Sequence, residues 1–439
     1  MDPLSSPLLT DLYELTMLQA YFERGMTDTA VFELFSRKLP PERNFLMAAG
    51  LEQALDFIEG FRFSDDELDW IARSGIFRRD FPGRLAGLRF TGDVHAVREG
   101  TLVFPNEPLL RVTAPMPQAQ ILETRVLNLI HFETVVASKA ARSVLAAPRK
   151  SLIDFGLRRS HGAEAGLLAA RASYLAGFAG TSTTLAAPRF GIPVFGTMAH
   201  SFVQAHESEE EAFAHFADVF PRNAVLLIDT YDTVEGARKA VAVGRGRPLK
   251  GVRLDSGDLG ALAKAVRPIL DAGGQKDAII FASGSLDEER VAELEAAGAP
   301  IDSYGIGTSL VTSADHPYLD AVYKLQEYAG RARRKRSTGK ATWPGRKQVY
   351  RHYDSAGRFT RDLVTVEGDA QPGEPLLELV MKDGKRLPQP GLAEARAHAL
   401  AQLERLPPRL RSLAAAAEPY PVEIAPALHA LAAEVDRHV

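Results

Sequence analysis

Short runs of apolar residues, each followed by an amphipathic stretch, recur through the middle of the chain from Ser151 to about Leu325. Apolar runs of strand length that alternate with helices are typical of β-α units built around a mainly parallel sheet or barrel. The predicted strands are Leu152 to Phe155, Pro193 to Phe195, Ala224 to Ile228, Gly251 to Leu254, Ala278 to Ala282 and Ile301 to Ile306. An eightfold barrel typically takes about 250 residues, so this shorter stretch predicts an irregular α/β barrel of about six to seven strands.

The region before this barrel mixes helices with a strand-rich middle. Apolar residues at helical spacing predict a helix from Leu12 to Phe22, and the sequence from Ser64 to Glu67 is typical of the capping box that opens a helix. Strand-like runs follow between Leu88 and Val112, and a long amphipathic helix is predicted from Gln118 to about Leu145. Residues 1–145 are therefore expected to form an N-terminal α+β domain.

The region after the barrel returns to strands and ends in helices. Strands are predicted at Lys347 to Tyr353, Arg358 to Val366 and Pro375 to Met381, and an Ala-rich helical tail begins at Leu392. We expect these segments to rejoin residues 1–145 in a second, mixed α+β domain. The predicted division is thus 1–145 for the N-terminal domain, 146–327 for the barrel with the active site, and 328–439 for the returning segments and the tail.

Composition and charge narrow the class of protein. A chain of 439 residues exceeds what one compact core usually holds, which favours two domains or a barrel with a flanking domain. The chain has no cysteine, which excludes disulfides, thiolate metal sites and cysteine nucleophiles. A net charge of −4 argues against a general nucleic-acid binder. Because no basic leader and no long apolar run occurs, we expect a cytoplasmic protein without a membrane span.

The ends of the predicted strands carry most of the polar chemistry of the chain. In a parallel α/β fold the carboxyl ends of the strands lie at one edge, where loops present side chains to ligands. The segments that follow the strands are Gly156 to Gly162, Gly196 to Ser201, Asp229 to Asp232, Asp255 to Asp258, Ser283 to Ser285 and Gly307 to Ser309. They are rich in glycine, hydroxyl, arginine and carboxylate groups, and one of them contains a histidine.

Each of these residue types suits a phosphorylated substrate. The two arginines of the first segment have planar guanidinium groups that fit a carboxylate or a phosphate. Carboxylates at two neighbouring strand ends, Asp229 and Asp255, are suited to hold Mg²⁺ directly or through water against a polyphosphate. The hydroxyl-rich turns after the last two strands offer backbone N–H groups to a phosphate. A phosphorylated sugar or a nucleotide is therefore the leading substrate class.

Each residue also has a purely structural explanation. Asp232, Asp258 and Ser285 are suited to cap helices, and the paired arginines to bind surface carboxylates. His200, taken by itself, is compatible with a hydrogen-bonded loop histidine. Five or six strand ends with this chemistry are nevertheless hard to explain by capping alone, so the substrate-binding interpretation is preferred.

Two phosphate-binding motifs fail on inspection. The segment from Ser337 to Lys340 resembles a P-loop, but Arg334 and Ala341 stand where that motif requires glycine and a hydroxyl residue. A dinucleotide fingerprint after Gly305 fails because Leu310 stands where the third glycine is required. The basic run from Arg331 to Arg336 keeps two explanations, contact with ATP or pyrophosphate and a solvated loop.

Five segments, in this order, closely resemble nicotinate phosphoribosyltransferases. They are Thr10 to Tyr13, Phe155 to Arg159, Gly196 to Ser201, Gly251 to Leu259 and Gly305 to Ser309. The resemblance implies an N-terminal domain completed by C-terminal segments, an irregular α/β barrel, and an active site at the interface of a homodimer. It also implies a step of NAD biosynthesis, in which nicotinate and 5-phosphoribosyl-1-pyrophosphate give nicotinate mononucleotide and pyrophosphate, coupled to ATP hydrolysis, with Mg²⁺.

The resemblance implies roles for individual residues. His200 matches a histidine that ATP phosphorylates transiently, a role that suits an imidazole able to be neutral near pH 7. Asp255 and Asp229 are expected near the ribose and the metal, and Asp255 is a candidate catalytic residue. Tyr13, expected from the partner subunit, and Phe155 are expected to sandwich the pyridine ring, because flat rings stack on aromatic side chains.

The remaining candidates are expected to bind the charged parts of the substrates. Those for the nicotinate carboxylate and the neighbouring phosphates are Arg158, Arg253 and Thr197, of which Arg253 is also a candidate catalytic residue. Those for the 5′-phosphate are Ser283, Gly284, Gly307 and Thr308, and Ser201 is a further substrate-binding candidate.

Three alternatives are kept. The related nicotinamide phosphoribosyltransferases place an aspartate where Ser182 stands in the segment Gly180 to Thr183, so the acid is favoured over the amide as substrate. A barrel lyase or aldolase acting through Lys324 or an aspartate would explain the phosphate turns but not the other segments. A non-catalytic binding module is the weakest, since no motif is degraded. Some family members have a cysteine-based zinc site near the C-terminus, which this chain lacks, and we interpret its tail as packing or dimer surface.

Overall fold

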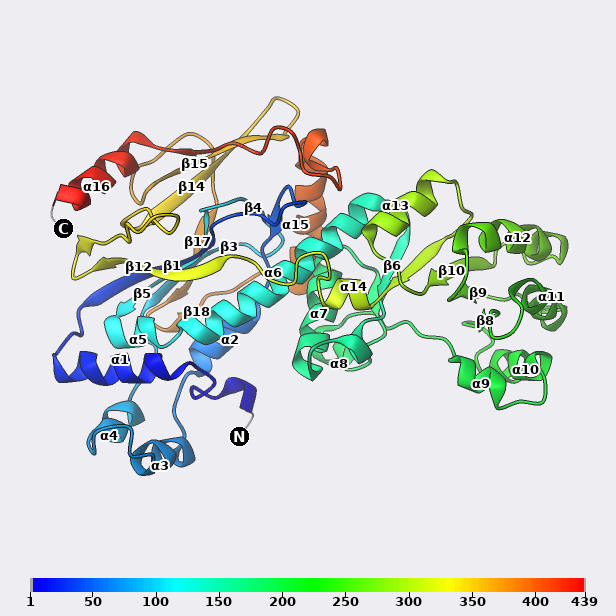
Figure 1. The fold of residues 1–439 in the computed structure, drawn as a ribbon, viewed down its shortest axis with the longest axis horizontal. Helices are drawn as coiled ribbons and strands as arrows, with labels where there is room; N and C mark the ends of the chain where they lie inside the picture. Colours follow the sequence, from blue (N-terminus) through cyan, green and yellow to red (C-terminus); the bar gives the residue numbers. More distant parts are fainter. Residues whose placement is uncertain (1–2, 438–439) are drawn as a thin grey trace. The chain divides into compact units, whose positions relative to one another are not determined.

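The structure is a computed structural model that describes residues 3–437, and the chain divides into two compact units (Figure 1). Unit 1 combines the chain up to Val135 with the chain from Tyr318 onward, and unit 2 is the continuous segment Val136–Pro317. The divisions predicted from the sequence, at 145/146 and 327/328, both lie further along the chain than the divisions after Val135 and after Pro317 in the structure. The first difference arises because helix α6 (Glu123–Ala146) continues through the division without a break in its apolar pattern.

Unit 1 is built on a seven-stranded sheet with the order β13-β12-β1-β5-β3-β17-β18. Its strands are β1 (Thr29–Ser36), β3 (Asp93–Val97), β5 (Pro108–Pro115), β12 (Ala321–Tyr328), β13 (Arg331–Ala332), β17 (Leu377–Lys382) and β18 (Lys385–Arg386). Strand β1 pairs antiparallel with β5 on one side and with β12 on the other. Both β12 and β17 come from the chain after unit 2, which explains why β12 belongs to unit 1.

Smaller sheets and helices complete unit 1. A four-stranded sheet has the order β16 (Glu374–Pro375), β14 (Lys347–Tyr353), β15 (Phe359–Val366) and β19 (Val422–Ile424), and β2 (Leu46–Met47) pairs with β4 (Leu102–Val103). The helices are η1 (Pro3–Ser5), α1 (Leu12–Glu23), α2 (Leu51–Gly60), α3 (Asp65–Arg73), α4 (Phe81–Ala86), α5 (Met116–Gln120), α15 (Leu392–Arg405), η3 (Pro408–Leu410) and α16 (Pro426–Arg437). Ser64 and Glu67 form the predicted capping box of α3. The single helix predicted from Gln118 to Leu145 is instead two helices, α5 and α6.

Unit 2 has the predicted β-α rhythm around a six-stranded, wholly parallel sheet. In sheet order its strands are β7 (Gly180–Thr181), β6 (Ser151–Asp154), β11 (Ser303–Ile306), β10 (Ile279–Ser283), β9 (Gly251–Leu254) and β8 (Val225–Leu227). The helices are η2 (Leu157–Arg159), α7 (Ala163–Ala176), α8 (Ala186–Phe190), α9 (His200–Gln204), α10 (Glu209–Val219), α11 (Thr233–Val243), α12 (Leu259–Ala272), α13 (Glu288–Ala296) and α14 (Thr308–Val311).

The closed barrel expected for unit 2 is not confirmed. The first strand, β6, pairs with the last, β11, as strands of a barrel do. On the other side of β7, Thr181 makes one parallel bridge to Val194, where a strand from Pro193 to Phe195 was predicted. Within residues 3–437 no pairing joins Val194 to β8, so the sheet stays open there. The sequence disfavours a strand here, because Pro193 at the start of the run has no backbone N–H to donate to a neighbouring strand, and Gly196 follows the run directly.

Candidate active site

A cavity of about 380 Å³ lies within unit 2 beside the ends of its strands. Its walls come from residues that follow β6 and β7, from the end of β9 and the residue after it, and from the loop that leads into α9. The lining residues are Phe155, Leu157, Arg158, Ser182, Gly196, Thr197, Met198, Ala199, His200, Arg253 and Asp255. Six of the residues predicted from the sequence as site residues, from three separate segments, therefore line one cavity: Phe155, Arg158, Thr197, His200, Arg253 and Asp255.

Arg253, on β9, connects three of these segments. Its Nε donates to Ser283 Oγ at 3.0 Å, and its Nη1 donates to Thr197 Oγ1 at 3.1 Å. Its Nη2 donates to Asp255 Oδ1 at 2.9 Å. The guanidinium carbon also lies 5.6 Å from the centre of the Phe155 ring, within range of a cation-π contact. The planar guanidinium group thus fixes the ends of β9 and β10 and the loop before α9 relative to one another.

Asp255 is an ionised carboxylate in the wall of this cavity. Burial raises its pKa, but hydrogen bonds from Ser283 and the charge and hydrogen bond of Arg253 outweigh burial, so the pKa lies below its usual value of 3.8. Oδ1 accepts the hydrogen bonds from Ser283 and Arg253. Oδ2 faces His200, whose Nε2 lies 3.9 Å away. The site therefore holds a fixed negative charge next to the imidazole.

His200 is the first residue of α9, and its side chain is half-exposed. Its Nδ1 lies 3.1 Å from Thr230 Oγ1, a hydrogen bond whose direction depends on the tautomer of the ring. With Nδ1 bonded to Thr230, Nε2 is the ring nitrogen next to Asp255. Thr230 belongs to a strand-end segment identified in the sequence but was not singled out as a site residue.

Asp229, after β8, has one carboxylate oxygen that accepts hydrogen bonds from the protein and one that accepts none from the described residues. Oδ2 accepts from the backbone N–H of Asp255 at 2.9 Å and from Ser256 Oγ at 2.6 Å. Oδ1 is buried and has no hydrogen-bond partner among the described residues. A free carboxylate oxygen of this kind fits Mg²⁺. Residues 3–437 contain no cluster of three or more metal-ligating side chains, so such an ion would need oxygens from substrate or water as well.

A buried carboxylate, Asp154, supports the wall made by Phe155 and Ser182. Its Oδ1 accepts from the backbone N–H of Gly156 at 2.8 Å, and its Oδ2 accepts from Thr181 Oγ1 at 2.7 Å. Burial raises its pKa to about 6, although both hydrogen bonds oppose that shift. Sequence reasoning missed this residue, because it treated Asp154 as part of an apolar strand. The available signal was a carboxylate at the end of an otherwise apolar run.

The two turns predicted to bind a phosphate are tied together. Ser309 Oγ, in α14, donates to the carbonyl of Leu286 at 2.6 Å. Gly284 has φ +97°, and a Cβ there would lie 2.0 Å from the carbonyl oxygen of Asp255. A Cβ on Gly307 would lie 2.9 Å from the carbonyl oxygen of Phe155. Both positions therefore need glycine, because the backbone of each turn packs closely against the backbone of another strand-end segment.

Other sequence-predicted residues fall into three groups. Asp258 caps α12 and Asp232 caps α11, as their structural explanation predicted, whereas the cap of α13 is Asp287 and not Ser285. Ser201 is exposed in α9, next to His200. Tyr13 is exposed on α1 and belongs to unit 1.

The lyase alternative loses the first of its two candidates, Lys324, and keeps only an aspartate at a strand end. Lys324 lies on β12 of unit 1, where its Nζ donates to Glu123 Oε1 at 3.2 Å and to the carbonyl of Tyr323 at 2.8 Å. It does not line the cavity around His200. Arg158, in contrast, lines that cavity, is exposed and makes no ion pair with any carboxylate of the described chain, so its guanidinium group is free to bind a ligand.

Comparison with known proteins gives one consistent family. Residues 8–131, 150–333 and 371–432 match, respectively, the N-terminal domain, the family region and the C-terminal domain of nicotinate phosphoribosyltransferase. The chain is 51% identical over 423 residues to nicotinate phosphoribosyltransferase pncB2 of Mycobacterium tuberculosis, covering 95% of this chain and 91% of that protein. It is 34% identical to the human nicotinate phosphoribosyltransferase, and the match covers 97% of this chain and 96% of the human protein.

Solved structures agree with these relatives. The crystal structure of human nicotinic acid phosphoribosyltransferase superposes with a TM-score of 0.86 at 32% identity, covering 97% of this chain and 99% of that one. The structure of a nicotinate-nucleotide pyrophosphorylase from Pyrococcus furiosus has a TM-score of 0.76 at 25% identity, covering 92% and 96%. In the part of the chain that the structure describes, no helix is long and apolar enough to span a membrane.

Proposed function

Because the chain belongs to the nicotinate phosphoribosyltransferase family and is therefore a phosphoribosyltransferase enzyme, we propose that it joins nicotinate to 5-phosphoribosyl-1-pyrophosphate and couples this transfer to ATP hydrolysis through a phosphorylated His200. The position of His200 carries the proposal. Its imidazole lines the same cavity as Arg253 and Asp255, with Nδ1 held by Thr230 and Nε2 beside Asp255.

In the transfer step the ring nitrogen of nicotinate forms a bond to C1 of the ribose. The bond from C1 to the pyrophosphate oxygen breaks, and pyrophosphate leaves with the electron pair. The ribose becomes cationic in the transition state, so the enzyme contributes mainly position and fixed charge. The carboxylate of Asp255, kept ionised by Ser283 and Arg253, supplies negative charge of the required sign.

We assign recognition of nicotinate to the wall of the cavity formed after β6 and β7. The ring of Phe155 offers a flat apolar face, and the free guanidinium group of Arg158 suits the carboxylate of nicotinate. Ser182 lines the same cavity with a neutral hydroxyl group. An aspartate there would repel a carboxylate, so the serine favours the acid over nicotinamide.

We assign phosphorylation to Nε2 of His200. When Thr230 Oγ1 accepts a hydrogen bond from Nδ1–H, the lone pair of Nε2 is free to attack the γ-phosphorus of ATP. A bond forms between Nε2 and phosphorus, and ADP leaves with the electrons of the broken P–O bond. Water later cleaves the P–N bond and releases phosphate. The phosphorylated imidazole would carry negative charge next to the bound substrates.

Mg²⁺ fits this site through carboxylate oxygens. Asp229 Oδ1 and Asp255 Oδ2 are the oxygens that we assign to it, directly or through water, because Oδ1 of Asp229 has no partner among the described residues. The ion would neutralise phosphate charge on the substrates. Ser283, Gly284, Gly307 and Thr308 are assigned to the 5′-phosphate, because hydroxyl and backbone N–H groups of turns that follow strands are suited to bind a phosphate.

We further propose that the working enzyme is a homodimer in which Tyr13 of one subunit completes the pyridine site of the other. The exposed Tyr13 ring, on α1, supports this assignment, since a large exposed aromatic side chain is typical of an interaction surface. Sedimentation of the purified chain tests the oligomeric state, and a mixture of Tyr13→Ala and His200→Ala variants tests the shared site. If sites are shared, such a mixture regains ATP-stimulated transfer at a rate that neither variant reaches alone.

The first experiment measures mononucleotide formation from 5-phosphoribosyl-1-pyrophosphate with nicotinate or nicotinamide, each with and without ATP and Mg²⁺. We expect product with nicotinate and stimulation by ATP. The His200→Ala variant should lose the stimulation and keep slow, ATP-independent transfer, whereas His161→Ala, an exposed histidine outside the cavity lining, should behave as the unmodified enzyme. Full ATP stimulation in His200→Ala would show that the assignment of His200 is wrong.

A further inference from the structure

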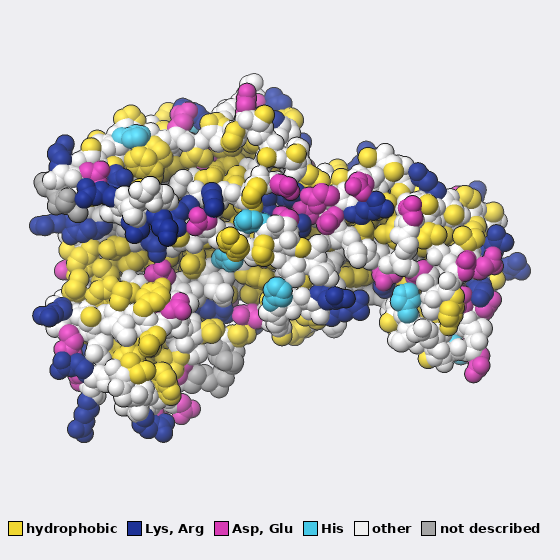
Figure 2. Space-filling view, viewed as in Figure 1, with side chains coloured by type: hydrophobic (Ala, Val, Ile, Leu, Met, Phe, Trp, Pro, Cys, Tyr) yellow, Lys and Arg dark blue, Asp and Glu magenta, His cyan; other side chains and the backbone are white. Residues whose placement is uncertain are grey.

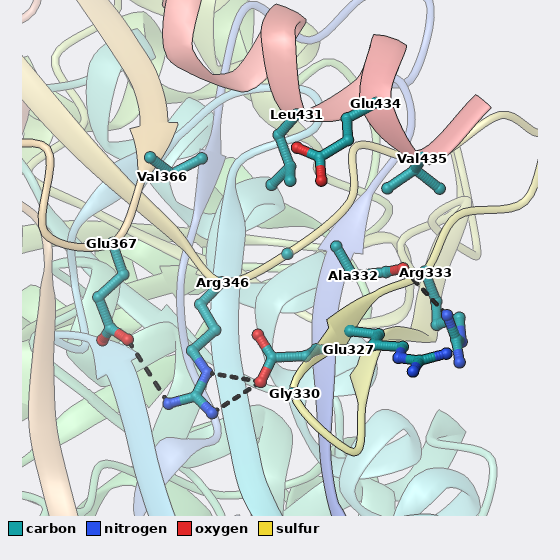
Figure 3. A pocket seen from close by; sticks show the side chains of 12 residues that line it. Glu327, Gly330, Ala332, Arg333, Arg346, Val366, Glu367, Leu431, Glu434 and Val435 are labelled. Atoms are coloured by element: carbon teal, nitrogen blue, oxygen red, sulfur yellow. Dashed lines mark hydrogen bonds and ion pairs between the residues drawn. The ribbon is translucent and has the colours of Figure 1, made fainter. Parts of the chain in front are cut away.

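A second and larger cavity, of about 850 Å³, lies within unit 1 (Figure 3). It is bordered by β12, β13, the start of β14, the end of β15 and α16. Its lining residues are Glu327, Gly330, Arg331, Ala332, Arg333, Gly345, Arg346, Val366, Glu367, Leu431, Glu434 and Val435. None of these residues lines the cavity around His200. Three of them belong to the basic run from Arg331 to Arg336, for which the sequence left two explanations, contact with ATP or pyrophosphate and a solvated loop. Its volume lies in the range of about 300–1,000 Å³ that is usual for small-molecule sites.

The charges at the centre of this cavity neutralise one another. Figure 3 shows the Arg346 side chain between two glutamates, with Nη2 2.8 Å from Glu327 Oε1 and Nη1 3.8 Å from Glu367 Oε2. The buried Arg111 also pairs with Glu367. Two arginines and two glutamates thus form a chain of ion pairs with no net charge. This part of the cavity has no charge left over for a ligand.

Two further arginines have guanidinium groups that are still available. Arg331 lies in β13 and Arg333 follows directly after the strand, and both line the cavity. Both are exposed, and neither forms an ion pair with a carboxylate of the described chain. Their neighbours differ, because Arg334 and Arg336 both pair with Asp436. In the face of the molecule that Figure 2 shows, Lys and Arg side chains gather on the left, where β12 and α16 lie in Figure 1.

The opposite side of the cavity is apolar with one carboxylate. Leu431 and Val435 of α16 and Val366 of β15 line it, and Figure 3 shows them above the ion pairs. Glu434, also on α16, is exposed and forms no ion pair with any cation of residues 3–437. The cavity therefore combines two free guanidinium groups, an apolar wall and one free hydrogen-bond acceptor.

We propose that this cavity binds a nucleoside phosphate. The phosphates bind Arg331 and Arg333, because guanidinium groups pair with phosphate oxygens through two parallel hydrogen bonds. The flat base packs against Val366, Leu431 and Val435. Glu434 accepts a hydrogen bond from a ribose hydroxyl or from an amino group of the base. This site is additional to the ATP-binding role proposed for the cavity around His200.

The test is binding and photolabelling of the full-length chain with ADP and 8-azido-ADP. Calorimetry with ADP should show a site whose affinity falls about tenfold or more in the Arg331→Ala/Arg333→Ala variant, because two charge-assisted contacts are lost. Lys382→Ala/Lys385→Ala removes the same charge from exposed positions outside the lining and should leave ADP binding unchanged. After labelling and trypsin digestion, the modified peptide should include Leu431 to Val435 of α16.

Two results would overturn the proposal. One is labelling confined to peptides of unit 2, which would mean that ADP binds only around His200. The other is an equal loss of ADP affinity in both double variants, which would mean that net charge and not this cavity attracts the nucleotide. Because the location of the label is read directly, neither result depends on whether His200 is phosphorylated.

Discussion

His200 Nε2 lies 3.9 Å from Asp255 Oδ2, while the other oxygen of Asp255 is held by Arg253 and Ser283. The two carboxylate oxygens thus have separate partners. Oδ1 keeps the carboxylate ionised and fixed in position, and Oδ2 places negative charge next to the imidazole. Any reaction at His200 or in the cavity in front of it takes place in the field of this charge.

The first prediction concerns this charge. Asp255→Asn should lower kcat/KM for nicotinate mononucleotide formation by about a hundredfold or more, because a neutral amide no longer stabilises a cationic ribose. Asp258→Asn is the matched control, since Asp258 stands in the same turn and only caps α12, a role that asparagine fills equally well. Steady-state kinetics with thermal unfolding of both variants checks the prediction. Equal activity of the two variants would contradict it.

The second prediction concerns the choice between the acid and the amide. Ser182→Asp should raise the ratio of kcat/KM for nicotinamide to that for nicotinate by about tenfold or more, because a carboxylate repels the acid and accepts a hydrogen bond from the amide. Ser182→Ala is the control, because it removes the hydroxyl group without adding a charge. It should shift the ratio of kcat/KM values much less than Ser182→Asp does. Initial rates with each substrate give the ratio. If Ser182→Asp lowers both rates equally, Ser182 does not control specificity.

The third prediction concerns pH and the buried Asp154. Burial raises the pKa of this carboxyl from its usual 3.8 to about 6, so between these values the folded state binds a proton that the unfolded state has lost. The stabilisation is complete below pH 4 and disappears as the pH rises through 6. At about 1.4 kcal/mol per pKa unit it amounts to about 3 kcal/mol.

Asp154→Asn removes this titration. The free energy of unfolding, measured with urea, should decrease between pH 4.5 and pH 7 in the unmodified chain. In the variant this decrease should be smaller. Because the change between the two pH values is compared in the variant and in the unmodified chain, the contributions of all other titrating groups cancel. An unchanged decrease would mean that Asp154 has a similar pKa in the folded and unfolded states.

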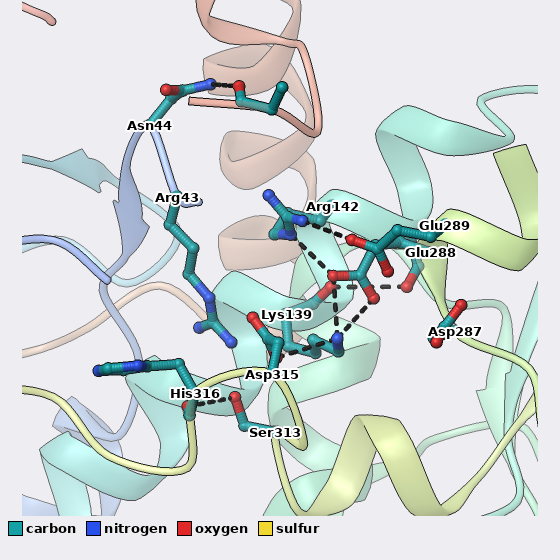
Figure 4. A network of polar contacts seen from close by, with 12 residues as sticks. Arg43, Asn44, Lys139, Arg142, Asp287, Glu288, Glu289, Ser313, Asp315 and His316 are labelled. Atoms are coloured by element: carbon teal, nitrogen blue, oxygen red, sulfur yellow. Dashed lines mark hydrogen bonds and ion pairs between the residues drawn. The ribbon is translucent and has the colours of Figure 1, made fainter. Parts of the chain in front are cut away.

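The fourth prediction concerns an ionic network within unit 2 (Figure 4). Glu288, fully buried at the start of α13, lies 2.7 Å from Lys139 Nζ and accepts a hydrogen bond of 2.8 Å from Arg142 Nε. Glu288→Ala leaves two buried cations without their main partner and should lower the free energy of unfolding by about 3 kcal/mol.

Glu289→Ala is the control for this network. Glu289 also binds Arg142, at 2.9 Å, but its side chain is 46% exposed. Its removal should lower the free energy of unfolding by less than about 1 kcal/mol, since solvent screens the pair. Denaturant unfolding of both variants measures the difference. An equal loss of free energy of unfolding in the two variants would show that the burial of Glu288 does not determine its contribution to stability.

Much of the fold was predictable, because local pattern determines most of its elements. Strands β9, β14 and β15 lie where alternating or apolar runs were identified, and Ser64 caps α3 as its spacing predicts. The two-residue strand β7 was missed, since two residues form no pattern. Whether the sheet of unit 2 closes into a barrel was not predictable from runs of residues either, because closure depends on pairing between strands that lie far apart in the sequence.

The candidate site was predicted unevenly for a similar reason. Motifs at strand ends identified His200, Arg253 and Asp255, which the structure brings into one cavity. The supporting residues Asp154 and Thr230 act through contacts with partners 27 and 30 residues away, which no local motif encodes. Residue type predicts the group that meets a ligand better than it predicts the group that holds it in place.

The order of strands in unit 1 also constrains how the protein is made. Strand β1 leaves the ribosome early, but its neighbour β12 follows only after the whole of unit 2, residues 136–317, has been synthesised. Until then one edge of the nascent sheet has unpaired N–H and C=O groups, which are prone to pair with other chains. Unit 2 is continuous and has no such delay. Interrupted translation before β12 should therefore yield a folded unit 2 attached to an incomplete, aggregation-prone N-terminal sheet.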